Sequence, residues 1–215
     1  ACARAEEGLS GPGQVLIWVS VDCFIVNPPA GYAIQPPARI ALRPVHIQNV
    51  GSPVDQALDG YWQRIYDGVG LEEAPFSVVS FVDRVKLRPY FNTHVFAVDP
   101  SLGLMGRWQS LFRELISEGD FQKGPCRPGL KKVFLHQALL SSLVVRELAQ
   151  DEIRFLSPAY SYPYNLQDQI PAGDLVENLG DLVSLTWEGR SLDPERVEDI
   201  RLGKKYHAWL ARYRS

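Results

Sequence analysis

The sequence predicts a single α/β domain, residues 1–215, with a mixed and mostly parallel sheet. Short apolar runs typical of buried strands alternate with longer segments whose apolar residues recur at helical spacing. Such alternation is typical of sheets covered by helices. The 215 residues, 46% hydrophobic and 22% charged, fit one globular domain, and no internal repeat, low-complexity tract or long linker divides the chain.

The predicted strands begin with an apolar run from Val15 to Val26 that contains Asp22. Residues 15–19 are predicted to form a central buried strand, because strands covered on both faces contain apolar residues throughout. Asp22 would then lie at the carboxyl end of this strand, where open α/β sheets bind their ligands. Further strands are predicted at 40–45, confined by Pro44 to an edge or a bulge, and at 78–82, 95–98, 153–156 and 182–187.

Capping residues and helical spacing of apolar residues predict the helices. Ser52 and Pro53 begin a helix that extends to Asp67 and buries the face containing Leu58, Trp62 and Ile65. A second helix is predicted to follow the Asp99-Pro100 pair and to end at Gly119, and a third to span about 136–148. A last helical segment is predicted to start at Asp193-Pro194. Gly203 separates it from a terminal segment, 204–214, whose apolar face is expected to dock on the domain.

Composition argues against several classes of function. The net charge is −3 and the 22 basic residues are scattered, so a nucleic-acid-binding surface is not indicated. The three cysteines have no metal-binding spacing, which argues against a disulfide scaffold and a structural zinc site and favours a reducing compartment. Because no apolar run approaches the roughly 18 to 20 residues of a membrane span, we expect a cytoplasmic protein.

Several short motifs follow one another over about residues 15–190. They are Leu16–Asp22, Arg43-Pro44, Leu58–Trp62, Arg88–Phe96, Asp99-Pro100 with Trp108, His136–Leu140 and Tyr162–Asn165. In this order they resemble the second half of the GT-A nucleotide-diphospho-sugar transferases, such as glycogenin-like enzymes. The resemblance implies a three-layer α/β/α fold without the family's amino-terminal nucleotide-binding units, and transfer of a sugar from a nucleotide-sugar to an unknown acceptor.

The resemblance also implies a site. Asp22 matches a carboxylate that binds Mn²⁺ or Mg²⁺, and such cations take oxygen ligands from carboxylates and phosphates. Asn92 and Gln137 match catalytic positions, where an amide can both donate to and accept from sugar hydroxyls. The remaining implied ligand-binding residues are Ser20, Asp22, Thr93, His94, His136 and Asn165.

Several of these positions depart from the family pattern. Ser20 stands where the family has the first aspartate of an Asp-x-Asp pair, His94 replaces a glycine, and His136 replaces the aspartate of Asp-Gln. The late strand ends without the metal-binding histidine of many relatives, and Glu188 is the candidate substitute there. Losing two charge-assisted ligands weakens cation binding by a factor on the order of a thousand or more, so the divalent cation is expected to bind weakly.

Other interpretations stay open. A catalytically degenerate homologue would bind a ligand or nothing, or would act as a structural or interaction protein. We also expect self-association through the sheet edge that the absent amino-terminal strands leave uncovered, or through the terminal helix. Asp22 is an alternative candidate for a turn residue, and His94 and His136 are better interpreted as partly buried histidines with satisfied hydrogen bonds. A Zn or Fe site formed by Asp22 with both histidines is a further alternative.

Overall fold

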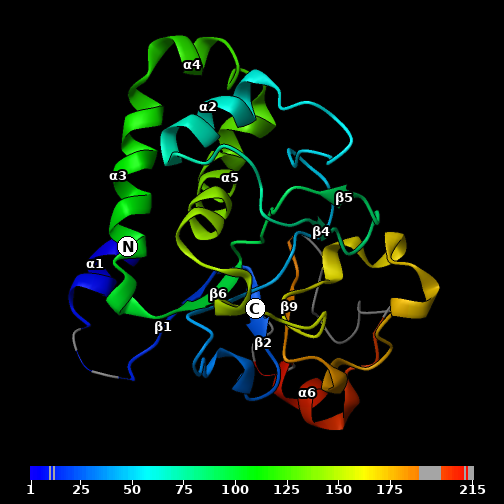
Figure 1. The fold of residues 1–215 in the computed structure, drawn as a ribbon. Helices are drawn as coiled ribbons and strands as arrows, with labels where there is room; N and C mark the ends of the chain where they lie inside the picture. The colour runs from blue at the N-terminus through cyan, green and yellow to red at the C-terminus, as the bar shows by residue number, and fades with distance from the viewer. Residues whose placement is uncertain (10, 12, 189–199, 211, 213–215) are drawn as a thin grey trace.

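The computed structural model describes residues 1–9, 11, 13–188, 200–210 and 212, which form a mixed α/β protein (Figure 1). Within these residues, nine strands form small sheets of four, three and two strands. The strands are β1 Leu16–Val19, β2 Cys23–Ile25, β3 Ile40–Leu42, β4 Val78–Val79, β5 Lys86–Leu87, β6 Val95–Val98, β7 Ile153–Phe155, β8 Tyr162–Pro163 and β9 Ser184–Thr186. The helices are α1 Cys2–Glu7, α2 Gly60–Val69, α3 Leu104–Ser117, α4 Gly119–Lys123, α5 Gly129–Glu147 and α6 Gly203–Leu210.

The four-stranded sheet has the order β1-β6-β3-β7. Strands β1 and β3 both pair antiparallel to β6, whereas the β3–β7 pair is parallel. In the three-stranded sheet, of order β2-β9-β8, the first pair is antiparallel and the second is parallel, and β4 pairs antiparallel with β5. The prediction of a mostly parallel sheet was therefore wrong. A short strand can bury the same side chains whether it pairs parallel or antiparallel. An apolar run therefore does not specify the direction of its partner strand.

The apolar run from Val15 to Val26 is not one strand. It divides into β1, β2 and an intervening turn in which Val21 is fully exposed. Strand β1 lies at the edge of the four-stranded sheet, with Ile17 44% exposed, so the prediction of a central buried strand was wrong. The central strands are β3 and β6, which are buried throughout. Two short apolar strands that belong to different sheets follow each other within this run. In the sequence they therefore look like one long buried strand.

Alternating residues of β3 and β6 face two different cores. Ile40 and Phe96 pack into the main core, which contains residues of α2, α3 and α5, and Figure 1 shows these helices gathered on one side. Ala41 and Ala97 face a second, smaller core on the opposite side. That side is covered by irregular segments, including the 3-10 helix Ala30–Tyr32, and not by a second layer of helices. Within the described residues, the three-layer α/β/α arrangement is therefore not observed.

Helix α2 begins later than predicted. Its first residue is Gly60 and its N-cap is Asp59, whose carboxylate accepts a hydrogen bond from the Trp62 backbone N–H at 3.0 Å. Pro53, the predicted start, instead forms an isolated bridge to strand β5. Proline suits both the first turn of a helix and an edge position, so the residue alone does not decide. The predicted apolar face is confirmed for Trp62 and Ile65, which are buried, whereas Leu58 lies before the helix and is partly buried.

Asp59→Ala is expected to lower the free energy of unfolding by about 1 kcal/mol, because the N-cap hydrogen bond is lost. Burial raises the pKa of Asp59. The hydrogen bonds that its carboxylate accepts from Lys131 Nζ and the Trp62 N–H outweigh this effect, so the pKa lies below the usual value. A carboxyl with a depressed folded-state pKa stabilises the fold above its unfolded pKa and loses this effect as pH falls through the folded value. Urea unfolding should show a difference at neutral pH that shrinks below about pH 4. A constant difference would contradict the ionic part of this explanation.

The later elements are found with shifted ends. Strands β6 and β7 lie where strands were predicted. Helix α3 ends at Ser117, and Gly119, expected to end it, starts the short helix α4. Helix α5 begins at Gly129, earlier than the predicted start at about 136.

The carboxyl-terminal helix α6 packs on strand β2. The Tyr206 hydroxyl donates to the Val26 carbonyl at 3.0 Å, and the ring centres of Trp209 and Phe24 lie 5.2 Å apart. The predicted docking of the terminal segment is confirmed for these residues, while the predicted helix start at Asp193-Pro194 lies outside the described residues. No helix in the described part of the chain combines the length and apolar composition that crossing a bilayer requires.

Candidate metal centre

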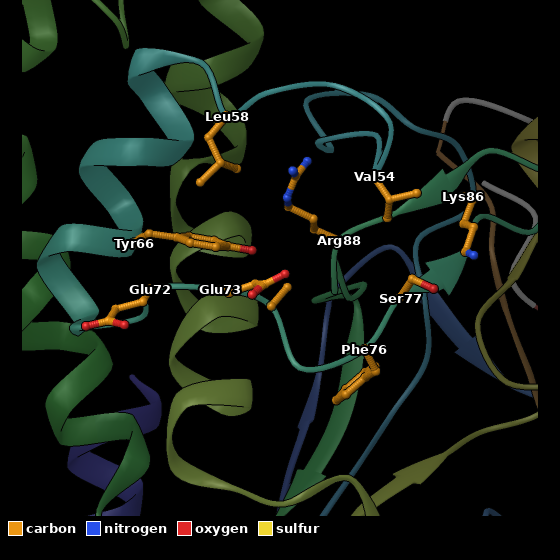
Figure 2. Close-up of a pocket in the computed structure, with 10 residues that line it drawn as sticks. Val54, Leu58, Tyr66, Glu72, Glu73, Phe76, Ser77, Lys86 and Arg88 are labelled. Atoms are coloured by element: carbon orange, nitrogen blue, oxygen red, sulfur yellow. The ribbon is translucent and has the colours of Figure 1, made fainter.

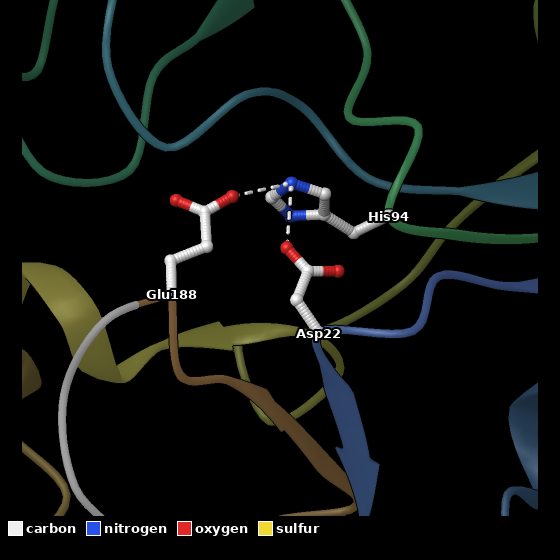
Figure 3. Close-up of side chains that lie close together, drawn as sticks. All are labelled: Asp22, His94 and Glu188. Atoms are coloured by element: carbon white, nitrogen blue, oxygen red, sulfur yellow. Dashed lines mark ion pairs between the residues drawn. The ribbon is translucent and has the colours of Figure 1, made fainter.

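Three side chains that can bind a metal ion come together between the four-stranded and three-stranded sheets (Figure 3). Asp22 follows β1, His94 precedes β6 and Glu188 follows β9. The His94 Nε2 atom lies 3.0 Å from Glu188 Oε1 and 3.7 Å from Asp22 Oδ2. One ligand atom from each residue lies within 4.8 Å of the other two. We call these three residues the cation cluster.

Strand pairing fixes the positions of these side chains. Strand β1 pairs with β6, and just beyond this pair the Ser20 N–H donates to the His94 carbonyl at 2.7 Å. Strand β2 pairs with β9, and just beyond this pair the Trp187 N–H donates to the Asp22 carbonyl at 3.2 Å. The first pairing therefore places His94 beside Asp22, and the second places Glu188 there.

The Asp22 carboxyl is ionised at neutral pH. Burial raises the pKa of Asp22, but the Ser20 hydroxyl and the nearby His94 outweigh this effect, so the pKa lies below the usual value. The Asp22 Oδ1 atom is buried and has no hydrogen-bond partner among the described residues. A buried carboxylate oxygen without a donor is costly, and a bound cation would satisfy it.

Asn165 links a fourth segment, the 3-10 helix Tyr164–Gln169, to the cluster. Its Nδ2 atom donates to Glu188 Oε2 at 2.8 Å, while the other carboxylate oxygen of Glu188 faces His94. The Asn165 Oδ1 atom is buried and, within the residues that the structure describes, has no partner. An amide oxygen is also a ligand for hard cations, and Asn165 stays a predicted ligand-binding residue.

Hydrogen bonds hold His94 on its other sides. Its Nδ1 atom lies 3.3 Å from Thr186 Oγ1, which in turn lies 2.9 Å from Ser161 Oγ. Its backbone N–H donates to Asn92 Oδ1 at 2.7 Å. When Nδ1 carries the proton and donates to Thr186, Nε2 is available to a cation, an arrangement that is usual for metal-binding histidines.

The predicted catalytic residue Asn92 is buried and bonded on both sides of its amide. Its Oδ1 accepts from the His94 N–H, and its Nδ2 donates to His46 Nε2 at 2.7 Å. Burial lowers the pKa of His46 well below the usual value, and the charges of Arg43 and His94 lower it further, so this histidine is neutral and can accept the bond. His46 has no motif around it, and sequence reasoning therefore missed its contact with the network.

Thr93 connects the other predicted residues to this network. Its hydroxyl donates to Gln137 Oε1 at 3.1 Å and lies 3.2 Å from His136 Nε2. His136 Nδ1 donates to the Val133 carbonyl at 2.9 Å, and burial lowers the pKa of His136, so it is a neutral histidine with satisfied hydrogen bonds. Neither His136 nor Gln137 belongs to the cation cluster, and the alternative Zn or Fe site with both histidines is not assembled among the described residues.

Comparisons with known proteins do not assign the chain to a family. No family model, no curated protein and no solved structure gives a significant match. The resemblance to the GT-A transferases therefore rests on the order of the motifs, and the strand order of these small sheets is not specific to that fold. The function has to be inferred from the cation cluster and its surroundings.

Proposed function

We propose that this chain binds a divalent cation, Mn²⁺ or Mg²⁺, through Asp22, His94 and Glu188, and that this centre serves the transfer of a sugar from a nucleotide-sugar to an acceptor. The observation that best supports the proposal is the position of Glu188 beside Asp22. The sequence motifs indicated one remaining metal ligand and weak binding. Three ligands from three segments would give a stronger site than that expectation allowed.

The donor set and its charge suit this chemistry. Two carboxylates and one imidazole can hold a divalent cation, and an octahedral ion keeps further positions for phosphate oxygens or water. When bound, the cation would neutralise the charge that develops on the diphosphate as its bond to the sugar breaks. In this proposal Asp22 and Glu188 supply the negative charge, and Asn165 and Thr186 orient Glu188 and His94 through the hydrogen bonds described above.

A second candidate is a homologue that binds the cation without catalysing transfer. Asn92 and Gln137, the predicted catalytic residues, are only 5% and 6% exposed. Both polar atoms of the Asn92 amide are bonded to histidine groups, and the Gln137 oxygen accepts from Thr93. This engagement favours the degenerate interpretation, because the bonded amide atoms are buried and already have protein partners.

The proposed location is the reducing environment of the cytoplasm. The three cysteines are free thiols, and burial raises the pKa of Cys23 to about 11, which makes it unreactive.

Self-association through a sheet edge also stays a proposal. Strand β1 is an edge strand with Ile17 partly exposed, and light scattering at high protein concentration would test whether it pairs with a second copy.

Calorimetric titration separates the two candidate functions. Mn²⁺ is titrated first, and UDP-glucose, UDP-galactose and GDP-mannose are then titrated with and without Mn²⁺. The transferase proposal predicts saturable nucleotide-sugar binding that requires Mn²⁺, and slow release of the nucleoside diphosphate on incubation. Cation binding without nucleotide-sugar binding would support the degenerate homologue. Absence of cation binding would refute both.

A further inference from the structure

A cavity of about 340 Å³ lies beside helix α2, the segment that follows this helix, and strand β5 (Figure 2). Its apolar wall includes Leu58, Tyr66 and Phe76, and none of its lining residues belongs to the cation cluster. Small-molecule sites in proteins have volumes of roughly 300–1,000 Å³ and apolar walls with a few polar groups. The cavity is therefore large enough for a small metabolite.

Charged side chains of both signs line this cavity from different segments. Glu72 and Glu73 follow α2, Lys86 lies in β5 and Arg88 follows β5. Among the described residues, none of these four side chains is in an ion pair. Two carboxylates and two cations therefore border one apolar wall without neutralising one another.

Arg88 is held in place by the protein. Its backbone N–H donates to the Ser52 carbonyl, and its Nη1 donates to Ser52 Oγ at 2.9 Å and to the Pro53 carbonyl at 2.5 Å. Figure 2 shows the Tyr66 ring and the Glu73 carboxylate pointing toward the space next to this guanidinium. Burial raises the pKa of Tyr66 to about 12 although the charge of Arg88 lowers it, so the phenol is a neutral hydrogen-bonding group. A guanidinium fixed at one nitrogen can offer its other N–H groups to a carboxylate.

We propose that this cavity binds a small zwitterion with an apolar body, of the chemical class of the free α-amino acids. Arg88 would bind its carboxylate, Glu73 its ammonium group, and the apolar wall its side chain. A simple anion would be repelled by Glu73, and a simple cation would be repelled by Arg88. An uncharged apolar ligand would remove water from both charges without pairing them. This site is independent of the proposed sugar transfer.

Calorimetry with L-phenylalanine and two blocked derivatives tests the proposal. N-acetyl-L-phenylalanine lacks the ammonium group, and L-phenylalaninamide lacks the carboxylate. We expect saturable binding of phenylalanine and about tenfold weaker binding of each derivative, because each loses a charge-assisted contact. Equal affinities for the three compounds, or no saturable binding of phenylalanine at millimolar concentration, would overturn the proposal.

Two variants assign the charges. Glu73 is exposed, so Glu73→Gln should leave the fold intact, and Arg88→Lys keeps the positive charge at a partly buried position. We expect Glu73→Gln to weaken phenylalanine about tenfold without weakening the N-acetyl derivative. We expect Arg88→Lys to weaken phenylalanine about tenfold without weakening the amide, because lysine lacks the planar N–H groups that pair with a carboxylate. Glu7→Gln and Lys132→Met change exposed charges elsewhere and should keep wild-type affinity. Variants that weaken all three compounds equally would refute charge recognition, and unchanged Mn²⁺ binding would separate this result from the fate of the cation cluster.

Discussion

Asp22→Asn is expected to weaken Mn²⁺ binding roughly 10- to 100-fold, and the double variant Asp22→Asn/Glu188→Gln is expected to leave no binding that calorimetry detects. A charge-assisted contact is worth about 1.5–3 kcal/mol, and 1.4 kcal/mol corresponds to a tenfold change in affinity. The Asp22 side chain is 22% exposed and that of Glu188 is 43% exposed. Because water screens the more exposed group, Asp22→Asn should have a larger effect than Glu188→Gln alone.

Asp55→Asn provides the matched control, since it removes an exposed carboxylate outside the cluster and should keep wild-type Mn²⁺ affinity. Urea unfolding without the cation separates loss of the fold from loss of a ligand. Mn²⁺ should raise the unfolding midpoint of the wild type and leave that of the double variant unchanged, because a ligand stabilises only the state that binds it. Wild-type affinity in the double variant would rule out the cluster as the cation site.

Strands and helix faces that depend on residues close together in the sequence were predictable. The strand at 95–98 matches β6, and the helical spacing of Trp62 and Ile65 correctly indicated a buried face. The partner of a strand depends on residues far along the chain. The composition of β1 indicated a central strand, yet it is an edge strand because β2 turns away into another sheet. Pro53 fits a helix start or an edge bridge, and only its contact with β5 distinguishes them.

The cation cluster was predictable as separate residues and not as a group. Asp22, His94 and Glu188 each had a reason to be considered, but the β1–β6 and β2–β9 pairings that join them connect segments distant in sequence. The burial of Asn92 and Gln137 could not be predicted from the sequence for a different reason. An amide that can orient a sugar hydroxyl can equally bond a buried histidine or threonine, so its chemistry does not show which partner it has.

Arg43→Met is expected to lower the free energy of unfolding by about 2–4 kcal/mol and to weaken Mn²⁺ binding. Arg43 is 3% exposed, and its Nη1 donates to the carbonyls of Pro158, Tyr160 and Ser161 at 3.2, 2.7 and 3.2 Å. Its guanidinium carbon also lies 5.0 Å from the centre of the Phe81 ring. Burial lowers the pKa of Arg43 to about 9, so the group is still charged at neutral pH.

Two opposing effects decide the size of this loss. Methionine removes the cost of burying a charge that, within the described chain, has no carboxylate partner. It also leaves three carbonyls without their donor, and an unpaired buried acceptor costs about 1–3 kcal/mol. We expect the loss of the donor to outweigh the relief from the buried charge. Three buried carbonyls lose their hydrogen-bond donor, whereas only one charge is removed. Arg43→Lys keeps the charge but not the planar donor geometry, and should give an intermediate loss.

The effect of Arg43→Met on the cation cluster follows from the loop that this guanidinium holds. Ser161 is bonded to Thr186, which holds the histidine of the cluster, so a displaced 158–161 segment should reduce Mn²⁺ affinity in protein that is still folded. Arg39→Met is the matched control, because it breaks an ion pair with Asp99 whose two side chains are 35% and 30% exposed. It should cost less than about 1 kcal/mol and leave Mn²⁺ affinity unchanged. An equally small loss for Arg43→Met would mean that the segment keeps its position, and the cluster its geometry, without the buried charge.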